Sequence, residues 1–77
     1  MKGGDLLGTI GENIRQQRMK RGLTQKELAK LLGFRDDLNG QIRVSEWERG
    51  VKQPRADTLK NIASVLKCSV DSLLKER

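Results

Sequence analysis

The sequence predicts an all-α domain built from about five short helices. Apolar residues recur at spacings of three and four, which place them on one face of a helix, and glycines or capping residues separate these repeats. No stretch alternates between apolar and polar residues with the period of two that a half-buried strand requires. The 77 residues have room for one small domain, predicted over residues 9–77 after a flexible N-terminal arm of residues 1–8.

The first helix is expected to begin at Thr9, because the residues before it contain three glycines and little periodicity. Ile10 and Ile14 are four residues apart and therefore share one face of this helix. Gly22 is expected to end it, because glycine readily adopts the left-handed conformation that follows many helices.

The second helix carries a specific start signal. Thr24 followed three residues later by Glu27 fits a capping box, and Leu23 and Leu28 occupy the positions of a hydrophobic staple. The helix is therefore expected to begin at Thr24 and to end at Gly33, after about two turns.

The third helix is expected over residues 41–49 and is closed by Gly50. Residues 35–39 contain two aspartates and precede an Asn-Gly pair, so they are predicted to form a loop. Val44 and Trp47 are three apart and are expected to face the core, which leaves a polar face suited to a DNA groove. This segment is the predicted recognition helix.

Two further helices complete the domain. Apolar residues at spacings of three and four predict a fourth helix over residues 56–67. Ser69 is a suitable N-cap for a fifth helix, whose apolar residues are Val70, Leu73 and Leu74.

Composition argues against catalysis and favours a polyanionic partner. The chain has no histidine, so the commonest general base and zinc ligand is absent, and its single cysteine, Cys68, is expected to serve packing. We therefore expect no catalytic site, metal site or cofactor, and no enzyme activity. A net charge of +6 and a pI near 10 are typical of proteins that meet nucleic acids. No apolar run is long enough to span a membrane and no signal peptide is evident, so a cytoplasmic location is expected.

Six groups of residues occur in a characteristic order: Ile-Gly-Glu-Asn-Ile-Arg at 10–15, Arg18, Gly-Leu-Thr-Gln-Lys-Glu-Leu-Ala at 22–29, Val-Ser-Glu-Trp-Glu-Arg-Gly at 44–50, Pro54 with Thr58-Leu59, and Ser-Val-Asp-Ser-Leu-Leu at 69–74. With these motifs the chain resembles the Cro/cI, or xenobiotic-response-element, family of helix-turn-helix DNA-binding domains. The resemblance implies a five-helix, lambda-repressor-like fold in which the second and third helices form the helix-turn-helix. It also implies that the third helix enters the major groove.

The resemblance and side-chain chemistry together assign base reading to Gln41, Arg43, Ser45 and Glu46. Gln can pair with adenine, Arg with guanine, and Glu can accept from cytosine. Two alternatives remain open at this point: Glu46 can instead pair with a nearby cation, and Ser45 can reach a phosphate or cover the helix face.

The resemblance places a second set of residues against the DNA phosphates, namely Gln25, Arg49, Lys52 and Arg55. Gln25 lies at the start of the second helix, where free N–H groups favour an anion. Arg18 and Glu48 match two family positions that pair across the first and third helices, so a structural ion pair is expected between them.

One departure from the family pattern precedes the recognition helix. Between Gly33 and Glu48 the chain carries about five residues more than the usual spacing, and residues 35–39 are the expected position of this surplus. A longer loop would shift the start of the third helix, which affects the role of Gln41 most.

The function expected from the resemblance is that of a sequence-specific DNA-binding transcriptional regulator, a repressor-like homodimer that associates through its C-terminal helix and binds a double-stranded DNA operator. No small-molecule ligand or membrane partner is expected. The alternative is a protein-interaction module, such as an antitoxin or adaptor subunit, that keeps the same fold.

Overall fold

The structure is a computed structural model that describes residues 6–75. Within these residues it contains five helices and no strand, so the predicted all-α class is confirmed. The helices are α1 (Leu6–Lys20), α2 (Gln25–Leu31), α3 (Asp37–Arg49), α4 (Ala56–Leu66) and α5 (Val70–Leu74).

Helix α1 begins three residues earlier than predicted. It starts at Leu6, so residues 6–8 belong to the helix and not to the expected arm, while residues 1–5 of that arm lie outside the described part of the chain. A glycine within a helix costs only about 1 kcal/mol relative to alanine, so Gly8 does not mark the helix start. The last helical residue is Lys20, and Gly22 closes the helix in the predicted left-handed conformation (φ 71°).

The predicted start of α2 is confirmed. The hydroxyl oxygen of Thr24 accepts a hydrogen bond from the backbone N–H of Glu27 at 3.0 Å, and the Glu27 carboxylate accepts one from the Thr24 N–H at 2.8 Å. This reciprocal pair is a capping box. Leu28 and Ala29 form the buried side of the helix.

Helix α3 differs from its prediction at the N-terminal end. The expected loop over residues 35–39 is confirmed only for residues 35 and 36 and is wrong for residues 37–39, because Asp36 is the N-cap of a 13-residue helix that begins at Asp37 and not at Gln41. One carboxylate oxygen of Asp36 accepts from the N–H groups of Leu38 (3.0 Å) and Asn39 (3.2 Å). Aspartate is favoured both in turns and at helix starts, so its presence alone did not distinguish a longer loop from a longer helix.

Helices α4 and α5 agree with the expected segments. Arg55 is the N-cap of α4 and makes no side-chain capping hydrogen bond, while Lys67 follows its last residue in a left-handed conformation (φ 57°). The hydroxyl of Ser69 caps α5 by accepting from the N–H of Ser72 at 3.0 Å. Leu73, on the inner side of α5, is fully buried.

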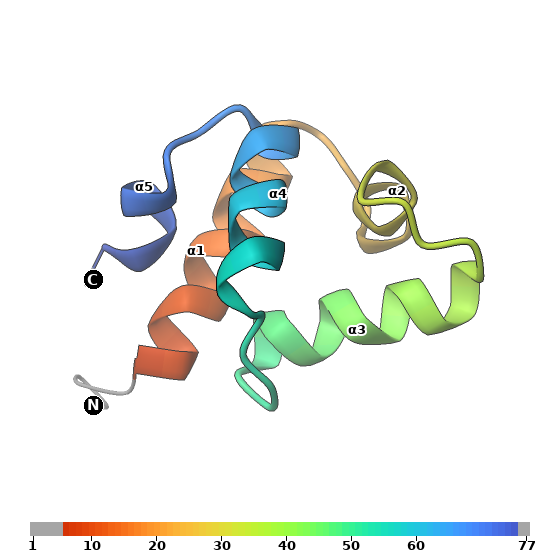
Figure 1. Cartoon of the computed structure of the whole chain (residues 1–77), viewed down its shortest axis with the longest axis horizontal. Helices are drawn as coiled ribbons and strands as arrows, with labels where there is room; N and C mark the ends of the chain where they lie inside the picture. The colour runs from red at the N-terminus through yellow and green to blue at the C-terminus, as the bar shows by residue number, and fades with distance from the viewer. Residues whose placement is uncertain (1–5, 76–77) are drawn as a thin grey trace.

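The core is aliphatic apart from one tryptophan. Its buried residues come from all five helices: Ile10, Ile14, Leu28, Ala29, Val44, Trp47, Leu59, Ile62, Ala63, Leu66 and Leu73. Figure 1 shows α3 along the lower edge of the molecule, with its N-terminal end beside α2 and its C-terminal end near α1 and α4. The outer side of α3 is therefore left open to solvent.

Two glycines allow neighbouring helices to approach α3 closely. A Cβ on Gly40 would lie 2.8 Å from the Cβ atoms of both Ala29 and Phe34, where α3 meets α2 and the connection after it. A Cβ on Gly11 of α1 would collide with the carbonyl oxygen of Trp47 and lie 2.8 Å from that of Glu48. The N-terminal part of α3 thus packs against α2 at Gly40, and its last turn packs against α1 at Gly11. Neither glycine leaves room for a Cβ atom.

Within the described part of the chain, no helix combines the length and the apolar character needed to cross a membrane.

Candidate nucleic-acid interface

The inner side of α3 is fixed by packing. Gly40, Val44, Trp47 and Glu48 are buried, and their spacing of three and four places them on one face of the helix. The ring centroids of Trp47 and Phe34 are 6.3 Å apart and the ring planes make an angle of 48°, within the range of favourable aromatic pairs. The packing roles expected for Val44 and Trp47 are therefore present in the structure.

Glu48 is held by a network that joins three helices. Its carboxylate accepts from two guanidinium nitrogens of Arg18 on α1, at 2.6 and 3.0 Å, which is the expected ion pair. The side chains are almost completely removed from solvent, 12% exposed for Arg18 and 3% for Glu48. Arg18 also donates to the carbonyl of Leu23 at 2.7 Å, which fixes the connection between α1 and α2.

Gln25 at the start of α2 belongs to the same network. Its amide nitrogen donates to a Glu48 carboxylate oxygen at 3.1 Å, and the residue is half-buried. One of its two amide hydrogens is engaged in this bond, while the other hydrogen and the amide oxygen are not part of it. Gln25, predicted to bind phosphate, is thus oriented by a residue of α3.

The outer side of α3, opposite its buried face, has Ile42 at its centre, Gln41 on one flank and Arg43 on the other. Gln41 and Arg43 are both exposed, but residues two apart on a helix point roughly 200° away from each other. These two side chains therefore leave α3 on opposite flanks and cannot read the same base edge. Ser45 lies on the Gln41 side of the centre, and Glu46 on the Arg43 side.

Ser45 and Arg49 are linked to each other. The Arg49 guanidinium donates to the Ser45 hydroxyl at 3.1 Å across one helical turn. A predicted base-reading residue and a predicted phosphate-binding residue thus form one polar unit on the outer side of α3. Glu46 is half-buried, and its backbone carbonyl accepts from the N–H of Val51 at 2.9 Å where the helix ends.

Ile42 lies at the centre of the outer side and was not among the residues predicted to read bases. It is 44% exposed and lies one position beyond Gln41, three before Ser45 and four before Glu46. The sequence could have predicted this exposure, because Ile42 is two residues from Val44, and residues two apart on a helix do not share the same face. An exposed apolar side chain at this place can contact the methyl group of thymine.

Lys52 and Arg55 lie between the end of α3 and the start of α4, and both are exposed. Because the Arg55 side chain does not cap α4, it leaves the first N–H groups of that helix without a side-chain acceptor from the N-cap. Exposed cations beside a helix N-terminus form an environment that favours a phosphate.

Acidic residues near the N-terminal end of α3 are locally compensated. The Asp37 carboxylate lies 3.8 Å from the Lys26 ammonium, and both side chains are about half exposed. Asp36 uses both carboxylate oxygens in hydrogen bonds to the first turn of α3.

The rest of the described chain offers no grouping for metal chemistry: residues 6–75 contain no cluster of three or more His, Cys, Asp or Glu side chains able to hold an ion. Cys68 is partly buried against the core. Burial raises the pKa of its thiol, while the Arg21 and Lys20 charges act in the opposite direction.

Comparison with known proteins places this geometry in a described family. The helix-turn-helix family model matches residues 14–73. Over 61 residues the chain is 41% identical to the HTH-type transcriptional regulator DicA of Escherichia coli K12, a match that covers 79% of this chain and 42% of DicA. It is 35% identical over 66 residues to repressor protein C2 of Salmonella phage P22, covering 86% of this chain and 28% of the repressor.

A solved structure of the P22 c2 repressor, in complex with a synthetic operator, superposes on this chain with a TM-score of 0.74 at 35% identity. The match covers 86% of this chain and 92% of that one. By contrast, the chain spans less than half the length of the two curated relatives, so the comparison concerns one part of each of those proteins.

Proposed function

Because the chain belongs to the Cro/cI-type helix-turn-helix family, we propose that it is a sequence-specific DNA-binding transcriptional regulator that places the outer side of α3 in the major groove of an operator. The observation that carries this proposal is the division of α3 into two sides. Its inner side is buried and tied to α1 and α2, whereas its outer side is exposed and belongs to a protein with a net charge of +6. A rigid helix whose free side carries polar groups around an exposed Ile42 is suited to reading base edges.

The centre of the outer side and its Gln41 flank are the proposed base-reading surface. Gln41 can bond adenine in bidentate fashion, Ile42 can contact a thymine methyl, and Ser45 can bond either class of base. Glu46 can accept from cytosine at the edge of this surface. Arg43 leaves the helix on the opposite flank, so it reads a different base pair from Gln41 or contacts the backbone.

Four residues are proposed to fix the protein on the DNA backbone: Gln25, Arg49, Lys52 and Arg55. Lys52 and Arg55 neutralise phosphates beside the start of α4. Gln25 presents its second amide hydrogen to a phosphate while Glu48 holds the first. Such contacts supply affinity without sequence information.

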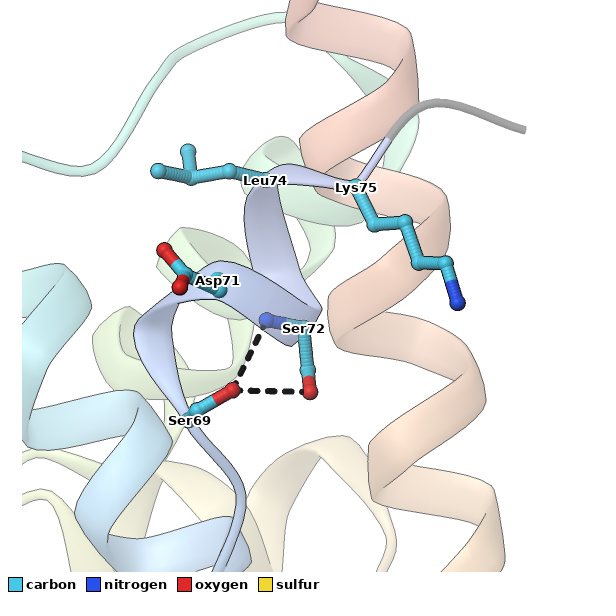
Figure 2. Close-up of a pocket in the computed structure, with 5 residues that line it drawn as sticks. All are labelled: Ser69, Asp71, Ser72, Leu74 and Lys75. Atoms are coloured by element: carbon cyan, nitrogen blue, oxygen red, sulfur yellow. Dashed lines mark hydrogen bonds between the residues drawn. The ribbon is translucent and has the colours of Figure 1, made fainter.

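We further propose that two copies bind together through α5. Leu74 is 39% exposed at the end of this helix, while its neighbour Leu73 is fully buried. Figure 2 shows Leu74 and Asp71 directed to one side of α5 and Lys75 to the other, around a shallow hollow that Ser69 and Ser72 also line. A two-fold dimer through this surface would require operator half-sites about one DNA turn apart.

A regulator of this kind acts where DNA is present, so the proposed location is the cytoplasm. Binding, not chemical conversion of a substrate, is the proposed activity.

In-vitro selection of bound DNA tests this proposal. The chain should enrich a sequence with two related half-sites, and Gln41→Ala should change the preferred base at one position of each. Lys52→Ala should instead weaken binding to all sequences alike and lower the slope of affinity against salt by about one unit. Random sequences after selection, or the same loss for both variants, would refute sequence-specific reading.

A further inference from the structure

The first turn of α3 is held in place by specific interactions and is not frayed. Asp36 caps it through one carboxylate oxygen, and its other oxygen accepts from the Asn39 side-chain amide at 3.0 Å. The Lys26 ammonium on α2 pairs with the Asp37 carboxylate, and Gly40 packs directly against Ala29 of α2. The turn is therefore held in helical form before any partner arrives.

This turn carries an apolar side chain that the fold does not use. Leu38 is 67% exposed, the highest value among the large exposed hydrophobic residues of the described chain. The Asp36 cap, the Lys26–Asp37 pair and the close approach of Gly40 to α2 explain why the turn exists. None of these contacts requires a leucine at position 38. A polar residue would meet the structural needs of the turn equally well.

Leu38 is aligned with the proposed base-reading surface. It precedes Ile42 by four residues, and Ser45 and Arg49 follow at intervals that keep all four on one line along the helix. At 1.5 Å per residue, Leu38 lies roughly 6 Å beyond Ile42 toward the N-terminal end of α3. That distance corresponds to about two base-pair steps of 3.4 Å.

The surroundings of Leu38 suit DNA. Its acidic neighbours are engaged, Asp36 by hydrogen bonds and Asp37 by Lys26, which limits their repulsion of phosphates. Arg35, immediately before the cap, is exposed and adds a cation at this end of the helix. The apolar group that the major groove offers to such a side chain is the C5-methyl of thymine.

We propose that Leu38 is a further specificity-determining residue, which reads a thymine methyl beyond the base pairs faced by Ile42 and Ser45. This inference rests on the proposed function, because it requires the outer side of α3 to lie in the major groove. It extends that function by predicting a longer half-site, with a thymine at the position that the additional turn reaches.

The experiment compares in-vitro selection by the full 77-residue chain and by its Leu38→Ala variant. The wild-type chain should enrich thymine at an outer position of each half-site, and L38A should lose that preference while keeping the inner positions. Leu31→Ala is the matched control, since Leu31 is a leucine of similar exposure (57%) on α2. Thermal unfolding should be unchanged in L38A, because an exposed leucine is replaced by the best helix former.

A second measurement removes only the methyl group. Uracil replaces thymine at the outer position of the selected DNA, and affinity is measured by titration. The wild-type chain should lose about fivefold in affinity, a loss on the scale of one weak base contact, and L38A should lose nothing.

The outcomes separate the two proposals. If the wild-type chain selects a sequence but L38A selects the same one, or uracil weakens both chains equally, Leu38 is not a reading residue and the proposed function stands. If the wild-type chain selects no sequence, both proposals are overturned. If L38A instead abolishes capture of a protein and leaves DNA selection intact, the occupant of this surface is a protein and this inference is wrong.

Discussion

Glu48 is the residue at which α1, α2 and α3 are joined. Its carboxylate receives the guanidinium of Arg18 and the amide of Gln25, so one buried charge orients an ion-pair partner and a proposed phosphate contact together. Removing the Arg18 charge would affect both the stability of the domain and the position of Gln25.

Arg18→Met is expected to lower the free energy of unfolding by about 3–5 kcal/mol, because it leaves the Glu48 charge buried without its partner. Urea denaturation followed by circular dichroism measures the change. Arg18→Met combined with Glu48→Leu should recover much of the loss, since neither charge is then buried.

The control is the exposed pair of Lys26 and Asp37. Lys26→Met should change the stability by less than about 1 kcal/mol, because these side chains are about half exposed and separated by 3.8 Å. Equal effects of Arg18→Met and Lys26→Met would contradict the structural role given to Glu48.

Cys68 provides a pH-dependent prediction. Burial raises the pKa of its thiol above the ordinary value, so folding favours the protonated form. The resulting stabilisation is complete below the pKa of the unfolded chain and is lost as the pH rises through the higher pKa of the folded chain. Labelling by a thiol reagent at mildly alkaline pH should be slower in the folded protein than in urea, because less thiolate is present. Faster labelling of the folded protein would show an activated cysteine instead.

At the scale of elements, the two glycine contacts of α3 determine how it sits on the domain. Gly40 meets Ala29 and Phe34, and Gly11 of α1 meets the last turn of α3. Both contacts involve atoms that cannot move aside easily, namely Cβ atoms close to the main chain and backbone carbonyls.

Gly40→Ala is therefore expected to destabilise the protein by about 1–3 kcal/mol, although alanine is normally the better residue within a helix. The same substitution at Gly11 should cost at least as much, because there the new methyl group meets backbone. Ser64→Ala, on the exposed side of α4, is the control and should leave the thermal midpoint within a few degrees of wild type. A stabilised Gly40→Ala variant would mean that α3 does not approach α2 as closely as described.

The sequence allowed some elements to be predicted more completely than others. The start of α2 follows from two residues three apart, Thr24 and Glu27, whose interaction is local and was predicted correctly. The start of α3 is marked by the Asp36 cap, which is equally local, but aspartate is favoured both at helix starts and in turns, so this residue did not distinguish the two. For this reason residues 35–39 were all interpreted as a loop, although residues 37–39 belong to the first turn of α3.

The same distinction applies to the candidate site. The pairing of Arg18 with Glu48 was expected from a resemblance and is present in the structure. The bond between Gln25 and Glu48 was not expected, because it joins side chains 23 residues apart that only the folded arrangement brings together. The opposite directions of Gln41 and Arg43 follow from helix geometry and were available from the sequence once the helix was assigned.

At the scale of the whole molecule, the proposed association of two copies through α5 would set the spacing of the two operator half-sites. Leu74→Glu would place a charge in the proposed apolar contact and should weaken self-association by about tenfold or more. Sedimentation equilibrium over a range of concentrations measures this change.

Met19→Glu is the matched control, because Met19 is also an exposed apolar residue (56%) but lies on α1. It should associate as the wild-type chain does. Equal dimerisation of Leu74→Glu and wild type would place the contact between copies on another surface.

The division of α3 into a buried side and a free side also has an evolutionary consequence. Val44 and Trp47 are fixed by the core and Glu48 by its ion pair, whereas Gln41 and Ile42 make no packing contribution of comparable extent. If the outer side of α3 reads DNA as proposed, substitutions at its outer positions would alter recognition at little cost in folding. A regulator built in this way would acquire a new target through a few changes on one helix, and duplicated copies would diverge in target while they keep the same scaffold.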